Sequence, residues 1–271
     1  MELLPRLLGQ VTATALSSSG EAGAWTQVSD VYGCAYAAAH RLAQPDLADM
    51  IVSCQVWAAQ QTWNPEAEVV PAWNEAGTYQ SAGHYDDGLA IVERAISRYE
   101  QAAGADTPAR ALSLGSLHLR GGVLASRHKD SNATEDHLRK AKSYAERIPN
   151  DILKHNLTFG QDNTALYELA ALIELGKPDK AAEMAAPLLK TPTASLTPNR
   201  LGRMHIDIAR VRLETRDYIG TEQALLKAFE VAPQMAEVHP MAREVIRVLF
   251  VLHQRARPKL MEMAKKTGLS G

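Results

Sequence analysis

Apolar residues recur three and four positions apart along almost the whole chain, which is the spacing of an amphipathic α-helix. The segments with this spacing are roughly 12 to 20 residues long, and the alternation of β-branched residues that marks a strand is almost absent. The pattern predicts helices over residues 2–16, 25–43, 45–61, 66–82, 85–103, 107–127, 133–148, 162–176, 178–190, 197–215, 218–231, 238–255 and 257–267.

Short polar segments separate the predicted helices in pairs. The turns within these pairs centre on Ala43, Gly83, His128, Gly176 and Arg216, which stand 40 to 48 residues apart. A repeat of this length, with two helices per unit, is typical of an α-solenoid, in which each hairpin buries its apolar face by stacking on its neighbours.

The segment SAGHYDDGLAIVERAIS, at residues 81–97, raises the question of whether its polar cluster has a chemical role. We interpret Gly83 as a turn residue, and Asp86 and Asp87 as the acidic start of a helix, where the helix dipole favours carboxylates. The turns in AGHYDDGLAIVERAI, LGKPDKAAEMAAPLL and TRDYIGTEQALLKAF share this arrangement and place small residues where two helices would cross. These positions resemble the tetratricopeptide repeat. The expected fold is therefore an all-α, right-handed α-solenoid of about six tetratricopeptide-like helical hairpins, in one domain over residues 1–271.

A closer resemblance covers almost the whole chain. The segments RLAQPDLADMI at 41–51, LSLGSLHLRGGVLASRHKDSNATEDHLRKAKSYAERI at 112–148, NLTFGQDNTALYELAALIELGKPDKAAEMA at 156–185 and EVHPMAREVIRVLFVLHQRARPKLMEMAKKTGL at 237–269 are similar to the sensor region of actinomycete regulators with a lambda-repressor-like helix-turn-helix domain. The DNA-binding helices of those regulators would precede LLPRLL and are not part of this sequence. The resemblance implies either an isolated sensor domain or a free-standing relative, with no direct DNA readout by this chain.

Composition and motifs exclude several other classes of protein. The two cysteines, Cys34 and Cys54, are too few for a disulfide framework, and we expect both thiols to be buried. The chain shows no signal peptide, no membrane-spanning segment and no nucleophile elbow, phosphate-binding loop or zinc-protease motif. We therefore expect a cytoplasmic protein that is not an enzyme, with no cofactor, no metal site and no membrane contact.

The net charge of −2 conceals an uneven distribution. Residues 1–100 hold 4 Lys and Arg against 12 Asp and Glu, whereas the rest of the chain holds 25 against 19. The basic residues near the C-terminus could contact nucleic acid, but they lack interleaved aromatic residues, so a solvated helix face is the preferred interpretation.

The first helix of each predicted hairpin faces the concave side of a solenoid, and several of these helices carry polar or aromatic residues there. Amide and guanidinium groups in such a row could bind backbone amides or carboxylates of a ligand, although solvated side chains are the alternative. The candidate ligand-binding residues are Trp73, Gln80, His118, Asn163, Arg203 and Arg210.

Two local motifs have a structural interpretation. In FGQDN, we expect Phe159 to pack the loop against the next helix, Gly160 to form the turn and Asp162 to cap the helix, which leaves Asn163 without a structural role. Tryptophan most often packs in a core, and we expect this of Trp25, Trp57 and Trp63, whereas Trp73 lies off the packing stripe.

Three functions remain open at this stage. The first is a regulatory sensor or interaction domain that binds a peptide, a small molecule or a partner protein in its concave groove, linked to transcriptional control of specialised metabolism or development. The second is a constitutive protein scaffold, and the third is a natural-product enzyme that uses a closed helical pocket. The Leu-rich face of residues 2–16 needs either the next hairpin or another subunit, so a homodimer is also expected.

Overall fold

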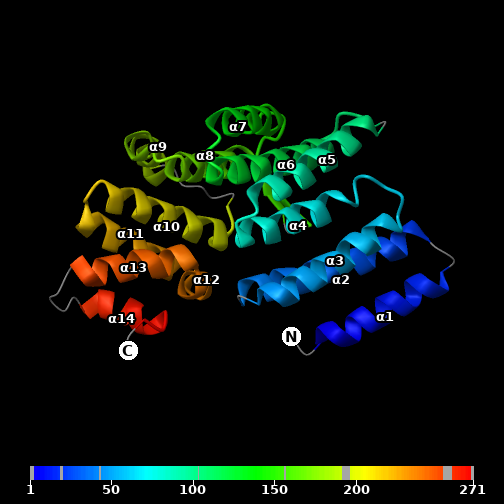
Figure 1. Ribbon diagram of the computed structural model, residues 1–271, viewed down its shortest axis with the longest axis horizontal. Helices are drawn as coiled ribbons and strands as arrows, with labels where there is room; N and C mark the ends of the chain where they lie inside the picture. The colour runs from blue at the N-terminus through cyan, green and yellow to red at the C-terminus, as the bar shows by residue number, and fades with distance from the viewer. Residues whose placement is uncertain are drawn as a thin grey trace. The chain divides into compact units, whose positions relative to one another are not determined.

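The structure is a computed structural model that describes residues 3–18, 21–42, 44–102, 104–155, 157–190, 196–252 and 258–269. It is built almost entirely of helices (Figure 1). The elements are α1 (Leu3–Ser17), α2 (Ala22–Arg41), α3 (Pro45–Gln60), α4 (Val69–Ala82), α5 (Tyr85–Gln101), α6 (Pro108–Arg127), α7 (Ser131–Ala145), β1 (Ile152–Lys154), β2 (Leu157–Phe159), α8 (Gln161–Glu174), α9 (Pro178–Lys190), α10 (Pro198–Glu214), α11 (Tyr218–Val231), α12 (Pro233–Val238), α13 (Pro240–Leu252) and α14 (Pro258–Lys266).

The helices form the hairpins that the sequence predicts, in an all-α solenoid of tetratricopeptide-like repeats. Four of the five turns are in place, and left-handed backbone at Gly83, Lys129, Gly176 and Arg216 reverses the chain there, with φ of 84°, 66°, 68° and 63°. At Gly83, backbone bonds to Gln80 O and Tyr79 O close the end of α4. The predicted turn at Ala43, and the predicted helical residues 253–255 and 257, lie outside the described residues.

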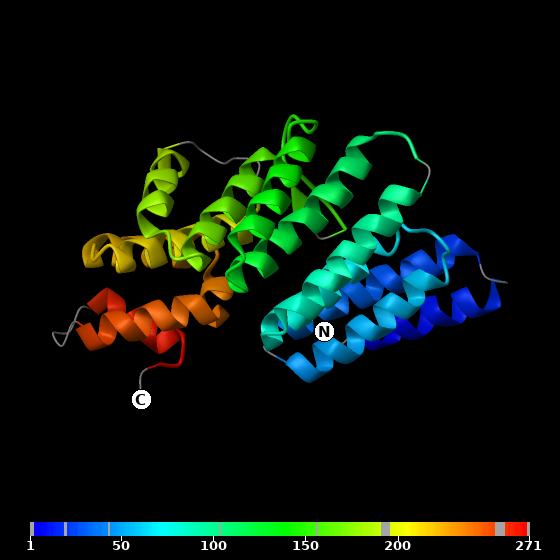
Figure 2. The ribbon, with the colours of Figure 1, turned by 45° about the horizontal axis from the view of Figure 1, so that its top comes forward.

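The chain divides into two compact units, residues 1–164 and 165–271. The single continuous domain expected from the sequence stays a prediction. Unit 1 stacks the hairpins α2–α3, α4–α5 and α6–α7, with α1 packed on α2 (Figure 2). Unit 2 packs α10, α11 and α13 around a core whose fully buried side chains are Leu169, Ile206, Ile208, Leu225, Ile246 and Leu249.

Small residues let the helices of a hairpin approach closely, as the repeat pattern predicts. A Cβ atom at Gly88 in α5 would lie 2.9 Å from Leu124 Cδ2 and 3.3 Å from the carbonyl oxygen of Ala76 in α4. Ala76 itself is completely buried. Because any larger side chain at residue 88 would separate α4 from α5, this glycine sets the distance between the two helices.

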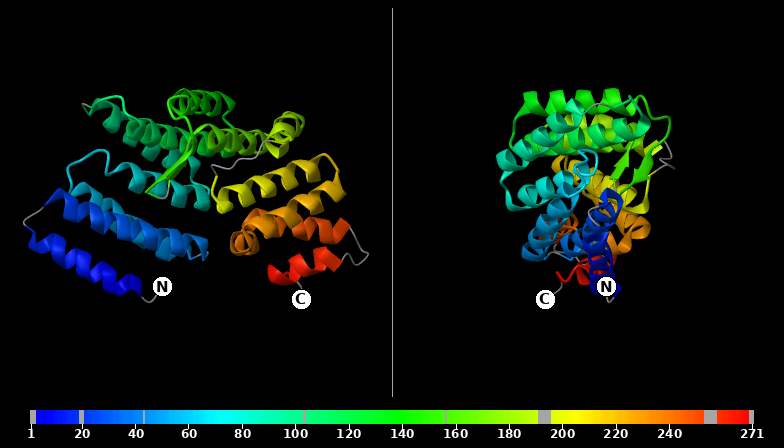
Figure 3. Two further views of the ribbon diagram at one scale, coloured as in Figure 1. Left: turned by 180° about the vertical axis from the view of Figure 1, so that it is seen from behind. Right: turned by 90° about the vertical axis from the view of Figure 1, so that its right-hand side faces the viewer.

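A β-hairpin between α7 and α8 was not expected from the sequence. Antiparallel pairing of β1 with β2 matches Ile152 to Phe159 and Lys154 to Leu157, which leaves a two-residue turn that begins at His155. His155 has φ of 49°, in the left-handed region that such turns require. Figure 3 shows the hairpin crossing the helices of unit 1, where β2 contacts α6.

The environments of four residues differ from the sequence expectation. Trp25 is buried, but Trp57 is 45% exposed and Trp63 is 91% exposed, so the core placement expected for both is wrong. Trp63 lies in the loop before α4, where its φ is 52°. Cys34 is exposed and Cys54 is only partly buried, so the burial expected for both thiols is also wrong. Among the described helices, none has the length and apolar character needed to cross a bilayer.

Candidate interaction site on the inner face of unit 1

The first helices of the three hairpins in unit 1, α2, α4 and α6, lie next to one another. We call the surface that they form the inner face. Two of the residues predicted from the sequence, Trp73 and Gln80, meet there around Arg120 of α6. The Arg120 guanidinium carbon lies 3.6 Å from the centre of the Trp73 ring, and its Nη1 donates a hydrogen bond of 2.6 Å to Gln80 Oε1.

This arginine is part of a buried polar cluster that joins the helices. Tyr36 Oη donates to the backbone oxygen of Asn74 at 3.0 Å, and Asn74 Nδ2 donates to Gln55 Oε1 at 2.8 Å. Gly77 leaves the space for it, because a Cβ atom there would lie 2.9 Å from Tyr36 Oη and 3.3 Å from Arg120 Nη2. The cluster therefore fixes the relative positions of α2, α3, α4 and α6 through directional bonds.

The charge of Arg120 acts on nearby titratable groups. Burial lowers the pKa of His40, and the positive charges of Arg120 and Arg41 lower it further. Burial raises the pKa of Tyr36, while Arg120 opposes that shift. At neutral pH the cluster thus contains a neutral imidazole and a neutral phenol beside one guanidinium.

His118 occupies a different place from the one expected. Its ring does not face the inner surface but lies between α6 and α7, 98% buried, with Nδ1 at 3.0 Å from Nδ1 of His137. Tyr144 stacks on the other side of the ring. Burial lowers the pKa of His118 to about 3, and His137 and Lys140 act in the same direction. The ring is a packed interhelical group.

Asn163 has the structural role that the sequence did not reveal. It is fully buried, and its Nδ2 donates to the backbone oxygen of Thr158 in β2 at 2.6 Å.

The cap of α8 is Asp151 and not Asp162, because the Asp151 carboxylate accepts the N–H groups of Asp162 and Asn163 at 3.1 and 2.7 Å. This pairing lies far apart in sequence, which is why local reasoning chose the nearer aspartate.

Arg203 and Arg210 belong to unit 2, on α10, and both contact the buried carboxylate of Asp207. Arg203 Nε donates to Asp207 Oδ2 at 2.8 Å, and Arg210 Nη1 lies 3.4 Å from Asp207 Oδ1 and 3.0 Å from Glu174 Oε1. Their guanidinium groups therefore bond carboxylates of the chain itself. Whether any of the six predicted residues binds a ligand stays a prediction.

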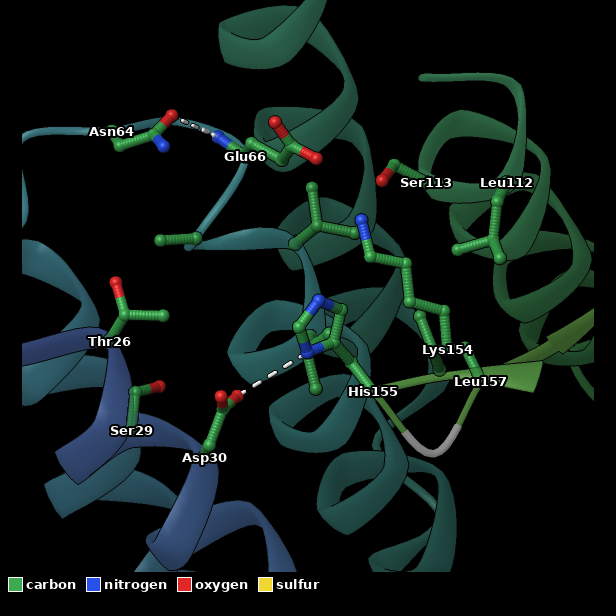
Figure 4. Close-up of a pocket in the computed structure, with 13 residues that line it drawn as sticks. Thr26, Ser29, Asp30, Asn64, Glu66, Leu112, Ser113, Lys154, His155 and Leu157 are labelled. Atoms are coloured by element: carbon green, nitrogen blue, oxygen red, sulfur yellow. Dashed lines mark hydrogen bonds and ion pairs between the residues drawn. The ribbon is translucent and has the colours of Figure 1, made fainter. Parts of the chain in front are cut away.

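A pocket opens between the inner face and the β-hairpin (Figure 4). It has a volume of about 130 Å³, and one side of its mouth is bounded by His155 Nδ1, which lies 3.5 Å from Asp30 Oδ1. Sequence reasoning missed this pocket because it missed the hairpin. The lining residues are Thr26, Ser29, Asp30, Asn64, Glu66, Ala67, Val69, Val70, Leu112, Ser113, Lys154, His155 and Leu157.

The pocket, which we call the inner pocket, has a mixed lining. Leu112 and Ser29 in its lining are buried, whereas the charged lining residues, which are of both signs, are exposed at its mouth. Within the described part of the chain, neither the Lys154 ammonium nor the Glu66 carboxylate has a hydrogen-bonded or ionic partner at its mouth. A small hollow lined by both apolar and polar side chains is typical of a site that receives one side chain of a partner.

The described residues contain no group of three or more histidine, cysteine, aspartate or glutamate side chains that could hold a metal ion. Two of the predicted site residues, Trp73 and His118, lie in separate clusters and outside the inner pocket. The absence of enzymatic activity stays a prediction.

No protein-family model matches the chain, and no curated protein matches it. Several solved structures are similar in fold, among them these two. The structure of BtubC (BKLC) from P. vanneervenii is 13% identical with a TM-score of 0.58, over 88% of this chain and 91% of that chain. The Cut9 and Hcn1 hetero-tetramer of APC/C gives 11% identity and a TM-score of 0.51, over 98% of this chain and 46% of that one. The fold is that of helical-repeat proteins. At these identities the likeness concerns the fold alone, and the chain spans less than half of the APC/C protein.

Proposed function

We propose that this chain is a protein-interaction module whose unit 1 binds an extended segment of a partner protein along its inner face. One side chain of that segment enters the inner pocket. The observation that carries the proposal is the pocket itself, with its buried Ser29 and Leu112 and its oppositely charged mouth groups, Glu66 and Lys154.

The size of the pocket favours a peptide over a free small molecule. A site for a drug-sized ligand has a volume of about 300 to 1,000 Å³. The inner pocket has about 130 Å³, which accommodates a single side chain. Glu66 and Lys154, whose charged groups have no bonded partner among the described residues, suit a peptide backbone and its flanking polar side chains, because each charge can replace the water that it loses with a hydrogen bond.

The helical-repeat fold agrees with this use, since hairpin stacks offer extended surfaces to other chains. One of the similar structures is itself a hetero-tetramer. The resemblance to sensor regions of helix-turn-helix regulators suggests that the bound segment reports a regulatory signal, in the control of specialised metabolism or development. A constitutive scaffold with the same pocket is the second candidate.

The experiment is a selection of peptides from a displayed random library against the full chain, followed by calorimetry. We expect a shared anchor residue in the selected peptides and roughly tenfold weaker binding to the Val70→Phe variant, whose ring fills the pocket. A matched control is Glu93→Gln on α5, outside the pocket, which should bind as the wild type does. Equal affinity of all three proteins, or no selected peptide, would refute the proposal.

The homodimer also stays a proposal. Helix α1 buries only Ala15, and Leu3, Leu7 and Leu16 are 77%, 42% and 67% exposed. A second copy of the chain could cover this apolar face. Light scattering of the wild type and of Leu7→Glu tests it, since a dimer formed through α1 would dissociate in the variant and an unchanged mass would exclude this interface.

A further inference from the structure

A second hollow lies between α3 and α4, and it shares no lining residue with the inner pocket. Its volume is about 360 Å³. We call it the α3–α4 groove, and it is lined by Asp49, Val52, Ser53, Glu75, Thr78, Tyr79, Ala82 and His84.

Oxygen acceptors dominate this groove. Neither Asp49 nor Glu75 has a hydrogen bond or an ion pair with the rest of the described chain through its carboxylate. The hydroxyl protons of Ser53 and Thr78 are already donated to the backbone oxygens of Asp49 and Glu75, at 2.9 Å each. Their remaining lone pairs can only accept, so the groove is suited to a group with several N–H donors and a positive charge.

Glu75 differs from a fully solvated surface carboxylate. Its side chain is partly buried, and burial raises its pKa, an effect that the charge of Arg94 opposes. A partly buried carboxylate without a bonded partner loses hydration and regains little of it within the chain. A cation that enters the groove would replace the lost hydration of the Glu75 carboxylate with hydrogen bonds.

An apolar stripe on α3 borders the groove. Leu47, Met50 and Trp57 are 46%, 69% and 45% exposed, and their spacing places Met50 and Trp57 on one side of the helix, next to Ser53. Trp57 is fixed in place because the rings of Trp25 and Trp57 meet edge to face, with centres 5.0 Å apart. From Leu47 to Trp57 the stripe is about 15 Å long, close to three helical turns.

We propose that the α3–α4 groove and the stripe of Leu47, Met50 and Trp57 together form a docking surface for a basic amphipathic helix of a partner protein. The apolar face of that helix packs on Met50 and Trp57, and a lysine or arginine from its edge enters the groove between Asp49 and Glu75. Charge complementarity identifies the partner, because residues 1–100 carry 12 acidic against 4 basic side chains. The same charge repels nucleic acid and anionic membranes.

The probe is a synthetic amphipathic helix of leucine and lysine, about 18 residues or five turns long. Its control is the same peptide with glutamate in place of lysine. Calorimetry with the full chain should give one bound lysine peptide per chain and no binding of the glutamate peptide. The Val70→Phe variant of the inner pocket should bind the lysine peptide normally, which separates this surface from the proposed function.

Two variants of the chain locate the binding. Asp49→Asn combined with Glu75→Gln should weaken binding of the lysine peptide at least about tenfold, and so should Met50→Glu. The matched control, Glu93→Gln combined with Glu100→Gln on α5, removes the same charge away from the groove and should change the affinity less than about twofold. Equal losses in the groove variant and the control would show unspecific attraction and overturn the proposal. Unchanged binding of the lysine peptide by Met50→Glu would also overturn the proposal. So would self-association of the wild-type chain that disappears in Met50→Glu, because a second copy of the chain would then be the occupant of the surface.

Discussion

The Nδ1 atoms of His118 and His137 lie 3.0 Å apart in the buried interface between α6 and α7. At this distance one ring donates a proton and the other accepts it, so the pair is complete when both rings are neutral. Gly121 makes the approach of α7 feasible, because a Cβ atom there would lie 2.6 Å from His137 Cε1. The pair joins two helices by a bond that depends on pH.

This pair predicts a loss of stability in mild acid. Burial lowers the pKa of both rings below 6.5, with His118 at about 3, while Lys140 acts in the same direction and Asp136 opposes it. Because the unfolded chain binds these protons at a higher pH than the folded chain, stability falls as pH drops below 6.5. The slope is at most about 1.4 kcal/mol per pH unit for each ring that stays neutral.

Urea unfolding between pH 7.5 and about 5, above most carboxylate titrations, measures this slope. His118→Asn removes one titrating ring and keeps an amide that can donate to His137, so its stability should depend less on pH. Burial also lowers the pKa values of His40 and His205, and these two rings contribute equally to the slope of the wild type and of His118→Asn. Identical slopes would mean that the pair does not control acid stability.

Arg120 is predicted to matter more for folding than an exposed arginine does. Arg120→Met removes the contact with the Trp73 ring and leaves Gln80 Oε1 without its 2.6 Å bond, which should destabilise the chain by about 2 to 4 kcal/mol. The control, Arg98→Met, breaks an ion pair with Glu68 in which the arginine is 60% exposed, and should cost less than about 1 kcal/mol.

The same variant has a second readout. Because the charge of Arg120 lowers the pKa of His40, Arg120→Met should raise that pKa. An NMR titration of the His40 ring in both proteins measures the shift. A pKa that does not move would show that Arg120 and His40 are not electrostatically coupled.

The different surroundings of Gly115 and Gly23 predict opposite effects of alanine on stability. A Cβ atom at Gly115 would lie 2.0 Å from Phe159 Cζ, so Gly115→Ala should displace the hairpin and destabilise the chain by about 1 to 3 kcal/mol. At Gly23 nothing lies within 4 Å of such an atom, so Gly23→Ala in α2 should stabilise by about 0.5 to 1 kcal/mol. Thermal unfolding compares the two. If Gly115→Ala left the stability unchanged, the hairpin would not pack against α6 as described.

The cap of α8 gives a further test. Asp151→Ala removes the acceptor of two backbone N–H groups and should cost about 1 to 2 kcal/mol. Asp162→Ala, in the first turn of the same helix, removes a carboxylate that the helix dipole favours and should cost less, about 0.3 to 1 kcal/mol. Chemical unfolding of both variants decides which aspartate is the cap, and a larger effect of Asp162→Ala would restore the assignment made from the sequence.

Much of the fold could be predicted from the sequence because hairpin turns leave local signals. Gly83 and Gly176 adopt the left-handed backbone that ends a helix, and the small residue Gly88 sets the spacing of α4 and α5. The β-hairpin was missed because its strands have three residues each, too few for a period to be recognised. Its signal was the alternation in ILKHNLTF around a two-residue turn.

The candidate site was harder to predict for a physical reason. Asp30 and His155 are 125 positions apart in sequence and meet only when the hairpin packs on α6 and its turn reaches Asp30 of α2. For Arg203, by contrast, the sequence did contain its partner: Asp207 stands four positions later on the same helix, the spacing of a helical ion pair. Reading that spacing would have assigned Arg203 to the fold and not to a ligand.

The central claim is that a partner side chain enters the inner pocket of unit 1. Methyl-labelled NMR of the full chain, with a peptide from the displayed library, tests it most directly. The account predicts that the largest shifts fall on the pocket methyl groups of Val69, Val70, Leu112 and Leu157. Shifts confined to methyl groups outside the pocket, with these four unchanged, would contradict it.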